Sequence, residues 1–106
     1  MKRIIYNKLV RDLIPGIIAS SGREPITQLI DPKLKEHYLQ EKLKEEMAEY
    51  LQSGSLEELA DLLEVVHGLL DCSGYTWDEL ETVRLAKKQQ RGGFEKGILL
   101  CEVIEP

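Results

Sequence analysis

Four carboxylates near the middle of the chain have the residue types and spacing of a metal site. Glu46 and Glu49 precede a short Gly–Ser turn, and Glu58 and Asp61 follow it. Carboxylates at half-buried positions repel one another and lose hydration, so they persist only with protons, cationic partners or metal ions. Ligands that are all oxygen atoms suit Mg²⁺, with Mn²⁺ as the second choice, rather than zinc.

The structure predicted around these residues is a pair of amphipathic helices joined by a tight turn. Gly54 suits the left-handed position after a helix end, and Ser55 is a natural N-cap for the next helix. With about 100° of rotation per residue, Glu46 falls inside the apolar stripe of the first helix, whereas Glu45 points away from it. The two stripes comprise Leu39, Leu43, Met47 and Tyr50, and then Leu56, Leu59, Leu62, Leu63, Val66 and Leu70.

In an antiparallel hairpin, residues at equal distances from the turn lie level with each other. Glu49 and Glu58 are each about four and a half residues from the middle of the turn. Glu46 and Asp61 are each about seven and a half residues away. The hairpin would therefore set each pair side by side, so that four carboxylates converge on one surface. Glu58 has a second interpretation, which the sequence leaves open: Ser55-x-x-Glu58 also fits a capping box, in which the carboxylate reaches back to the Ser55 amide.

A short helix is predicted before the hairpin. Asp12 is placed to cap a helix over residues 13–21, with Pro15 in its first turn, where the missing N–H does no harm. The apolar face that this helix should bury comprises Leu13, Ile14, Ile17 and Ile18.

The rest of the chain predicts a mainly α fold in one domain, residues 1–106. Asp31 begins the first hairpin helix as its N-cap, and a capping box opens a third long helix over residues 76–90. Residues 25–30 and 98–104 have the composition of short strands, which would form a small two-stranded β element leaning on the helices. So few helices leave apolar surface uncovered, so we expect a homo-oligomer, dimer or tetramer, that completes a helix bundle.

Charge and cysteine usage exclude several classes of partner. The net charge of −5 argues against a nucleic-acid polymer or an anionic membrane surface. An acidic centre with basic residues on both flanks instead suits a metal–triphosphate ligand. Cys72 and Cys101 show neither metal-ligand spacing nor a disulfide framework, and no signal peptide or membrane-spanning apolar run is present. We therefore expect a cytoplasmic protein.

The carboxylate spacing also resembles a known signature. Glu45-Glu46-x-x-Glu49 followed by Glu58-x-x-Asp61 is similar to the EExxE…ExxD motif of the all-α nucleoside triphosphate pyrophosphohydrolases. That superfamily includes MazG, the dimeric dUTPases and phosphoribosyl-ATP pyrophosphohydrolase. Residues 6–12 (YNKLVRD) and 91–94 (RGGF) resemble a small, single-domain, MazG-like branch of it. The gap between Glu49 and Glu58 is shorter than in MazG and many of its relatives.

The resemblance implies an Mg²⁺-dependent hydrolase that converts a nucleoside triphosphate to the monophosphate and pyrophosphate, with the removal of non-standard nucleotides as one role. The metal ligands would be Glu46, Glu49, Glu58 and Asp61, and Glu45 is a candidate for orienting or deprotonating the attacking water. Candidate phosphate-binding residues are Lys8, Arg11, Lys87 and Arg91. Phe94 either stacks on the nucleobase or anchors the C-terminal segment in the core. The alternatives are phosphoribosyl-ATP pyrophosphohydrolase and a helical interaction module without catalysis.

Overall fold

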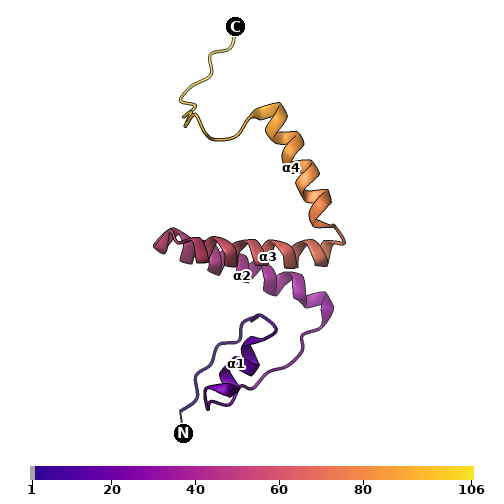
Figure 1. Cartoon of the computed structure of the whole chain (residues 1–106). Helices are drawn as coiled ribbons and strands as arrows, with labels where there is room; N and C mark the ends of the chain where they lie inside the picture. Colours follow the sequence, from indigo (N-terminus) through magenta and orange to yellow (C-terminus); the bar gives the residue numbers. More distant parts are fainter. Residues whose placement is uncertain (1) are drawn as a thin grey trace. The chain divides into compact units, whose positions relative to one another are not determined.

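Helices make up the regular structure of this protein. The computed structural model describes residues 2–106, which form four helices and no strand. They are α1 (Ile14–Ser20), α2 (Pro32–Ser53), α3 (Leu56–Ser73) and α4 (Trp77–Arg91) (Figure 1). The mainly α-helical class predicted from the sequence is therefore confirmed.

The chain separates into two compact units. Met1–Gly74 contains α1, α2 and α3, and Tyr75–Pro106 contains α4. The prediction that residues 1–106 form a single domain stays a prediction. Across residues 2–106, no helix combines the length and the apolar character needed to cross a membrane.

Local side-chain and backbone chemistry sets the ends of α2 and α3. Asp31 caps α2, and its carboxylate accepts a hydrogen bond from the Lys33 backbone N–H at 2.9 Å. Gly54 ends α2 in the left-handed conformation, at φ +64°. Ser55 then caps α3, because its hydroxyl accepts a hydrogen bond from the Glu58 backbone N–H at 3.3 Å. The two-residue connection between the helices brings α3 back along α2 (Figure 1).

A narrow apolar strip holds α2 and α3 together. Leu39 on α2 and Val65 on α3 are buried, at 7% and 6% exposed. Gly68 allows the close approach, since a Cβ at that position would lie 2.9 Å from Leu39 Cδ2. Glu46 is as deeply buried as these two apolar residues, at 6% exposed. The prediction that Glu46 lies inside the apolar stripe is confirmed, and a carboxylate is thus part of the helix–helix contact.

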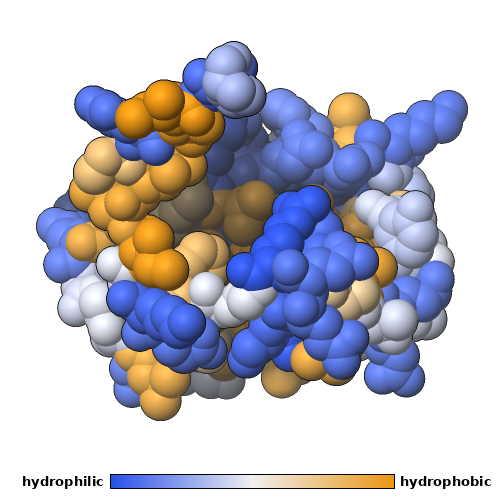
Figure 2. Space-filling model, turned by 90° about the horizontal axis from the view of Figure 1, so that it is seen from above, coloured by the Kyte–Doolittle hydropathy of each residue, from blue (hydrophilic) through white to orange (hydrophobic). Residues whose placement is uncertain are grey.

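Much of the predicted apolar stripe lies at the surface of the single chain. Met47 on α2 and Leu56, Leu59 and Leu63 on α3 are exposed. Two paired helices bury only the strip between them, so the outer rows of each stripe stay in contact with solvent. Figure 2 shows hydrophobic residues at the surface among the hydrophilic ones. The expectation that so few helices leave apolar surface uncovered on the single chain agrees with this exposure.

The prediction for the first helix needs two corrections. Leu13, not Asp12, is the N-cap of α1, and no side chain makes the capping hydrogen bond. Leu13 already has helical backbone angles, and a turn closed by the Ile14 N–H donating to the Arg11 carbonyl precedes it. Pro15 does lie in the first turn, as predicted. Leu13 and Ile17 are exposed rather than buried, because a helix of seven residues has little surface with which to pack.

The predicted strands at residues 25–30 and 98–104 are wrong, since neither segment is a strand in the structure. Two short strands without a third make a marginal pair in water, and β-branched composition alone does not hold them together. The helix predicted at residues 76–90 is correct to within one residue. Its capping box is complete: the Thr76 hydroxyl accepts from the Glu79 N–H, and the Glu79 carboxylate accepts from the Thr76 N–H, each at 3.1 Å.

Candidate metal site

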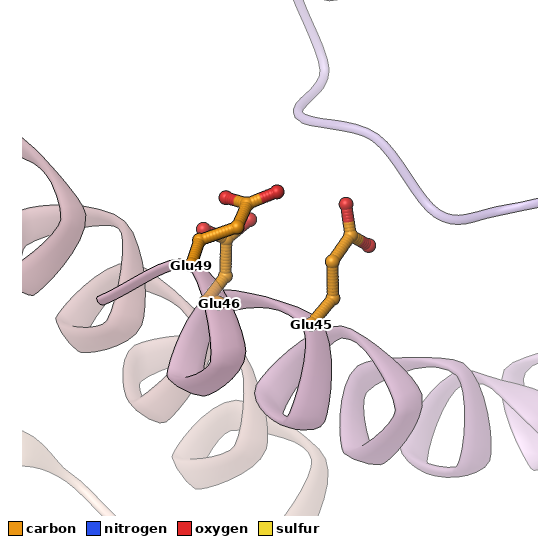
Figure 3. Close-up of side chains that lie close together, drawn as sticks. All are labelled: Glu45, Glu46 and Glu49. Carbon is orange, nitrogen blue, oxygen red and sulfur yellow. The ribbon is translucent and has the colours of Figure 1, made fainter. Parts of the chain in front are cut away.

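The structure gathers the predicted carboxylates into two groups that share Glu46. In the first group, Glu45, Glu46 and Glu49 rise from one side of α2 (Figure 3). In the second, Glu46 from α2 meets Glu58 and Asp61 from α3. Within each group, one oxygen from every carboxylate lies within 4.8 Å of the others. Oxygen ligands at this separation suit a hard divalent cation such as Mg²⁺.

The Glu58 side chain belongs to the second carboxylate group and does not form a capping box. The Ser55 backbone N–H, which the Glu58 carboxylate would accept from in a capping box, donates instead to the Ser53 hydroxyl at 3.2 Å. Glu58 Oε2 is buried and has no hydrogen-bond partner among the residues that the structure describes. The geometry thus answers the question that the sequence left open: Ser55 caps the helix, and the Glu58 side chain lies beside Glu46 and Asp61 without completing a capping box.

Glu46 is the most deeply buried carboxylate of the site. Burial raises its pKa above the ordinary value, and the neighbouring Glu49 and Asp61 carboxylates raise it further. Lys42 opposes the effect, because its Nζ lies 3.5 Å from Glu46 Oε1. The other oxygen, Oε2, is buried without a hydrogen-bond partner in the described part of the chain. Lys42 thus balances the carboxylate charge at Oε1 only. A second cation, bound at Oε2, would stabilise the ionised form of Glu46.

Two cations from the N-terminal segment contact the same carboxylates. Lys8 Nζ lies 2.7 Å from Glu45 Oε1, and Arg11 Nη2 lies 2.8 Å from Asp61 Oδ1. The hydrogen bond from Lys8 holds the pKa of Glu45 below its ordinary value, and the same bond raises the pKa of Lys8. The prediction that Lys8 and Arg11 belong to the site is compatible with this geometry, although here they meet carboxylates and not phosphate.

Sequence reasoning missed Lys42 and misplaced Glu45. Lys42 is largely buried and contacts both Glu45, at 3.4 Å, and Glu46, at 3.5 Å. The signal was available, since positions three and four residues apart share one face of a helix. Glu45 was expected to point away from the apolar stripe into solvent, but its side chain is only 27% exposed because Lys8 and Lys42 lie against it.

A cavity of about 610 Å³ lies beside this site, on the Lys8 and Glu45 side. The N-terminal segment contributes Asn7 and Leu9 to its wall, and α2 contributes Tyr38 and Lys42. Its size falls in the range of small-molecule sites, which run from about 300 to 1,000 Å³. The cavity is thus large enough for a nucleotide-sized ligand next to the carboxylates.

The other predicted substrate-binding residues belong to the second unit. Lys87 and Arg91 lie on α4, with Arg91 as its last residue. Phe94 follows the helix and is 99% exposed, so its alternative role as a core anchor is wrong. A stacking role for Phe94 stays a prediction.

Comparisons of the chain with protein-family models, curated proteins and solved structures give no match, so the functional argument rests on the residues themselves.

Proposed function

We propose that this protein is an Mg²⁺-dependent nucleoside triphosphate pyrophosphohydrolase, which cleaves between the α and β phosphates. The observation that carries the proposal is the pair of carboxylate groups joined at Glu46, with buried oxygens on Glu46 and Glu58 that have no hydrogen-bond partner within residues 2–106. An unpartnered buried anion is destabilising, and a bound cation at these oxygens would remove that cost. The EExxE…ExxD resemblance supports the choice of reaction.

The residues fit the metal that this chemistry needs. Glu46, Glu49, Glu58 and Asp61 would hold the ions through carboxylate oxygens only, the ligand type that Mg²⁺ prefers. When bound, Mg²⁺ supplies charge stabilisation at the phosphoryl oxygens and lowers the pKa of a bound water. Glu45, whose carboxylate also lies 3.4 Å from Lys42 Nζ, would accept a hydrogen bond from the attacking water and orient it.

The charges and the cavity support the substrate class that the resemblance implies. Lys8 and Arg11 are the candidate phosphate-binding residues beside the carboxylates, and cationic groups stabilise the charge spread over transferring phosphoryl oxygens. Lys87 and Arg91, in the second unit, stay candidates from the sequence alone. The cavity beside Lys8 would receive the nucleoside. Removal of non-standard nucleotides in the cytoplasm is the role that we propose.

A product assay tests the proposed function. Ordinary, deoxy and damaged nucleoside triphosphates, and phosphoribosyl-ATP, are incubated with the protein in Mg²⁺ and in EDTA, and both products are identified. We expect pyrophosphate and the monophosphate, in Mg²⁺ only. Orthophosphate with the diphosphate would place cleavage at the wrong bond. Turnover of phosphoribosyl-ATP alone would make that biosynthetic substrate the right one, and no turnover at all would favour the interaction module.

The basic residues give a prediction about substrate affinity. Lys8→Ala and Arg91→Ala should each raise KM for the triphosphate about tenfold, because each variant loses one charge-assisted hydrogen bond to phosphate. Unfolding free energies should change by less than about 0.5 kcal/mol, since both residues lie at the surface. Lys96→Ala, an exposed lysine outside the proposed site, is the control. Steady-state kinetics identical to the wild type in both variants would remove these residues from the site.

The exposed apolar residues of α3 support the proposed homo-oligomer. Leu59 and Leu63 lie four residues apart, on one face of the helix, and are exposed in the single chain. We expect light scattering to give a multiple of the monomer mass for the wild type, and the monomer mass for Leu59→Asp/Leu63→Asp. Glu64→Ala, on the same helix, should keep the wild-type mass. A monomeric wild type at micromolar concentration would contradict this prediction.

A further inference from the structure

The N-terminal strap, residues 6–11, is joined to both helices of the carboxylate site. Lys8 reaches Glu45 on α2, 37 positions along the chain, and Arg11 reaches Asp61 on α3, 50 positions along. One strap thus places an ammonium on the first carboxylate group and a guanidinium on the second. These are the groups that share Glu46.

The acceptors of these two bonds are carboxylates that the proposed site uses. Glu45 Oε1 and Asp61 Oδ1 are each engaged by a strap cation at under 3 Å. Glu46 Oε2 and Glu58 Oε2, by contrast, are buried and have no hydrogen-bond partner in the described chain. A divalent cation that binds Glu46 Oε2 and Glu58 Oε2 would therefore lie near Glu45 and Asp61, whose negative charges are already paired with Lys8 and Arg11.

The strap is held in a way that permits exchange. The side chains of Lys8 and Arg11 are 42% and 53% exposed, and water screens ion pairs of this kind so that they contribute little to stability. Tyr6 and Val10 are also exposed, and Leu9 is the one half-buried residue of the strap. Separating Lys8 and Arg11 from their carboxylates would therefore disrupt few buried side-chain contacts.

We propose that Lys8 and Arg11 are exchangeable counter-ions that couple metal binding to triphosphate binding. This inference rests on the proposed function. In the metal-free protein the two cations neutralise Glu45 and Asp61, and they compete with a divalent metal ion for those carboxylates. When metal and triphosphate bind together, the two cations leave the carboxylates and donate to phosphate oxygens instead. Metal and triphosphate then assist each other's binding, and linkage requires the assistance to be reciprocal.

The test compares two binding reactions in Lys8→Met/Arg11→Met, neither of which needs turnover. Binding of Mn²⁺ alone is followed by the electron paramagnetic resonance signal of the free ion. Binding of the preformed Mn²⁺–tripolyphosphate complex is followed by calorimetry. We expect the variant to bind Mn²⁺ alone about tenfold more tightly than the wild type, and the complex about tenfold more weakly, each equal to roughly 1.4 kcal/mol. Tighter binding of the metal ion together with weaker binding of the complex is the result expected if the two cations exchange between carboxylate and phosphate.

Two controls make the outcome decisive. Lys2→Met/Arg3→Met removes one lysine and one arginine from the segment that precedes the strap, and it should alter both affinities far less. Lys8→Arg/Arg11→Lys keeps the charges and should preserve the coupling. Weaker binding of both probes by the Met variant, or unchanged binding of both, would overturn the coupling while leaving the metal site in place. No Mn²⁺ binding by any variant would overturn the metal site and the coupling together.

Discussion

Glu46→Gln is expected to lower Mg²⁺-dependent pyrophosphate release by about two to three orders of magnitude, the effect seen when a group that stabilises transition-state charge is lost. Glu46 is the carboxylate common to both groups, so neutralising it weakens the ligand set contributed by α2 and the one contributed by α3. Gln keeps the size and shape of the side chain, so the packing of α2 against α3 should survive. The measurement is the initial rate of pyrophosphate release at saturating Mg²⁺ and substrate.

A matched substitution separates this effect from a general change in charge. Glu64→Gln makes the same chemical change at an exposed position of α3 outside both groups, and it should keep nearly full activity. Circular dichroism should show equal helix content in both variants. Wild-type rates in Glu46→Gln would mean that the carboxylate groups have no part in the reaction, even if the protein hydrolyses nucleotides.

The parts of this structure that local chemistry decides could be predicted from the sequence. Asp31, Gly54, Ser55 and Thr76 act through hydrogen bonds or backbone angles within a few residues, so their helix ends were placed correctly. Helical periodicity also located Glu46 in the contact between α2 and α3, because that position depends only on rotation about one helix axis.

The sequence-based predictions failed where the structure depends on contacts between residues far apart in the chain. Helical periodicity identifies an apolar face but not what covers it. The sequence therefore predicted uncovered apolar surface, which Leu59 and Leu63 provide, but it could not identify the surface that would pack against them. The ion pairs of Lys8 and Arg11 join positions 37 and 50 residues apart, which no local pattern encodes. The half-buried position of Glu45 depends in part on the pair with Lys8. The predicted strands failed for a related reason, since strand pairing depends on partners far along the chain.

Thermal unfolding should give the second large effect, a reversal in the order of stability of wild type and Glu46→Gln when Mg²⁺ is added. Without metal at neutral pH, the variant should be more stable by about 1 kcal/mol, because it removes a buried charge with an unpartnered oxygen. With Mg²⁺ at a hundredfold excess over its dissociation constant, the wild type should gain about 2.7 kcal/mol, and the variant much less. Melts in Mg²⁺ and in EDTA measure both differences.

The pH dependence of the metal-free comparison tests the cause. The pKa of Glu46 is raised in the folded protein, so the protonated side chain favours folding below the ordinary value of 4.5, and this contribution is lost as pH rises through the raised pKa. The advantage of Glu46→Gln should therefore be largest at neutral pH and should disappear in acid, where both side chains are neutral. The Lys8–Glu45 pair weakens in acid in both proteins, so it cancels from the difference. A constant difference across pH would assign it to packing, and a wild-type melt unmoved by millimolar Mg²⁺ would remove the physical basis of the metal site.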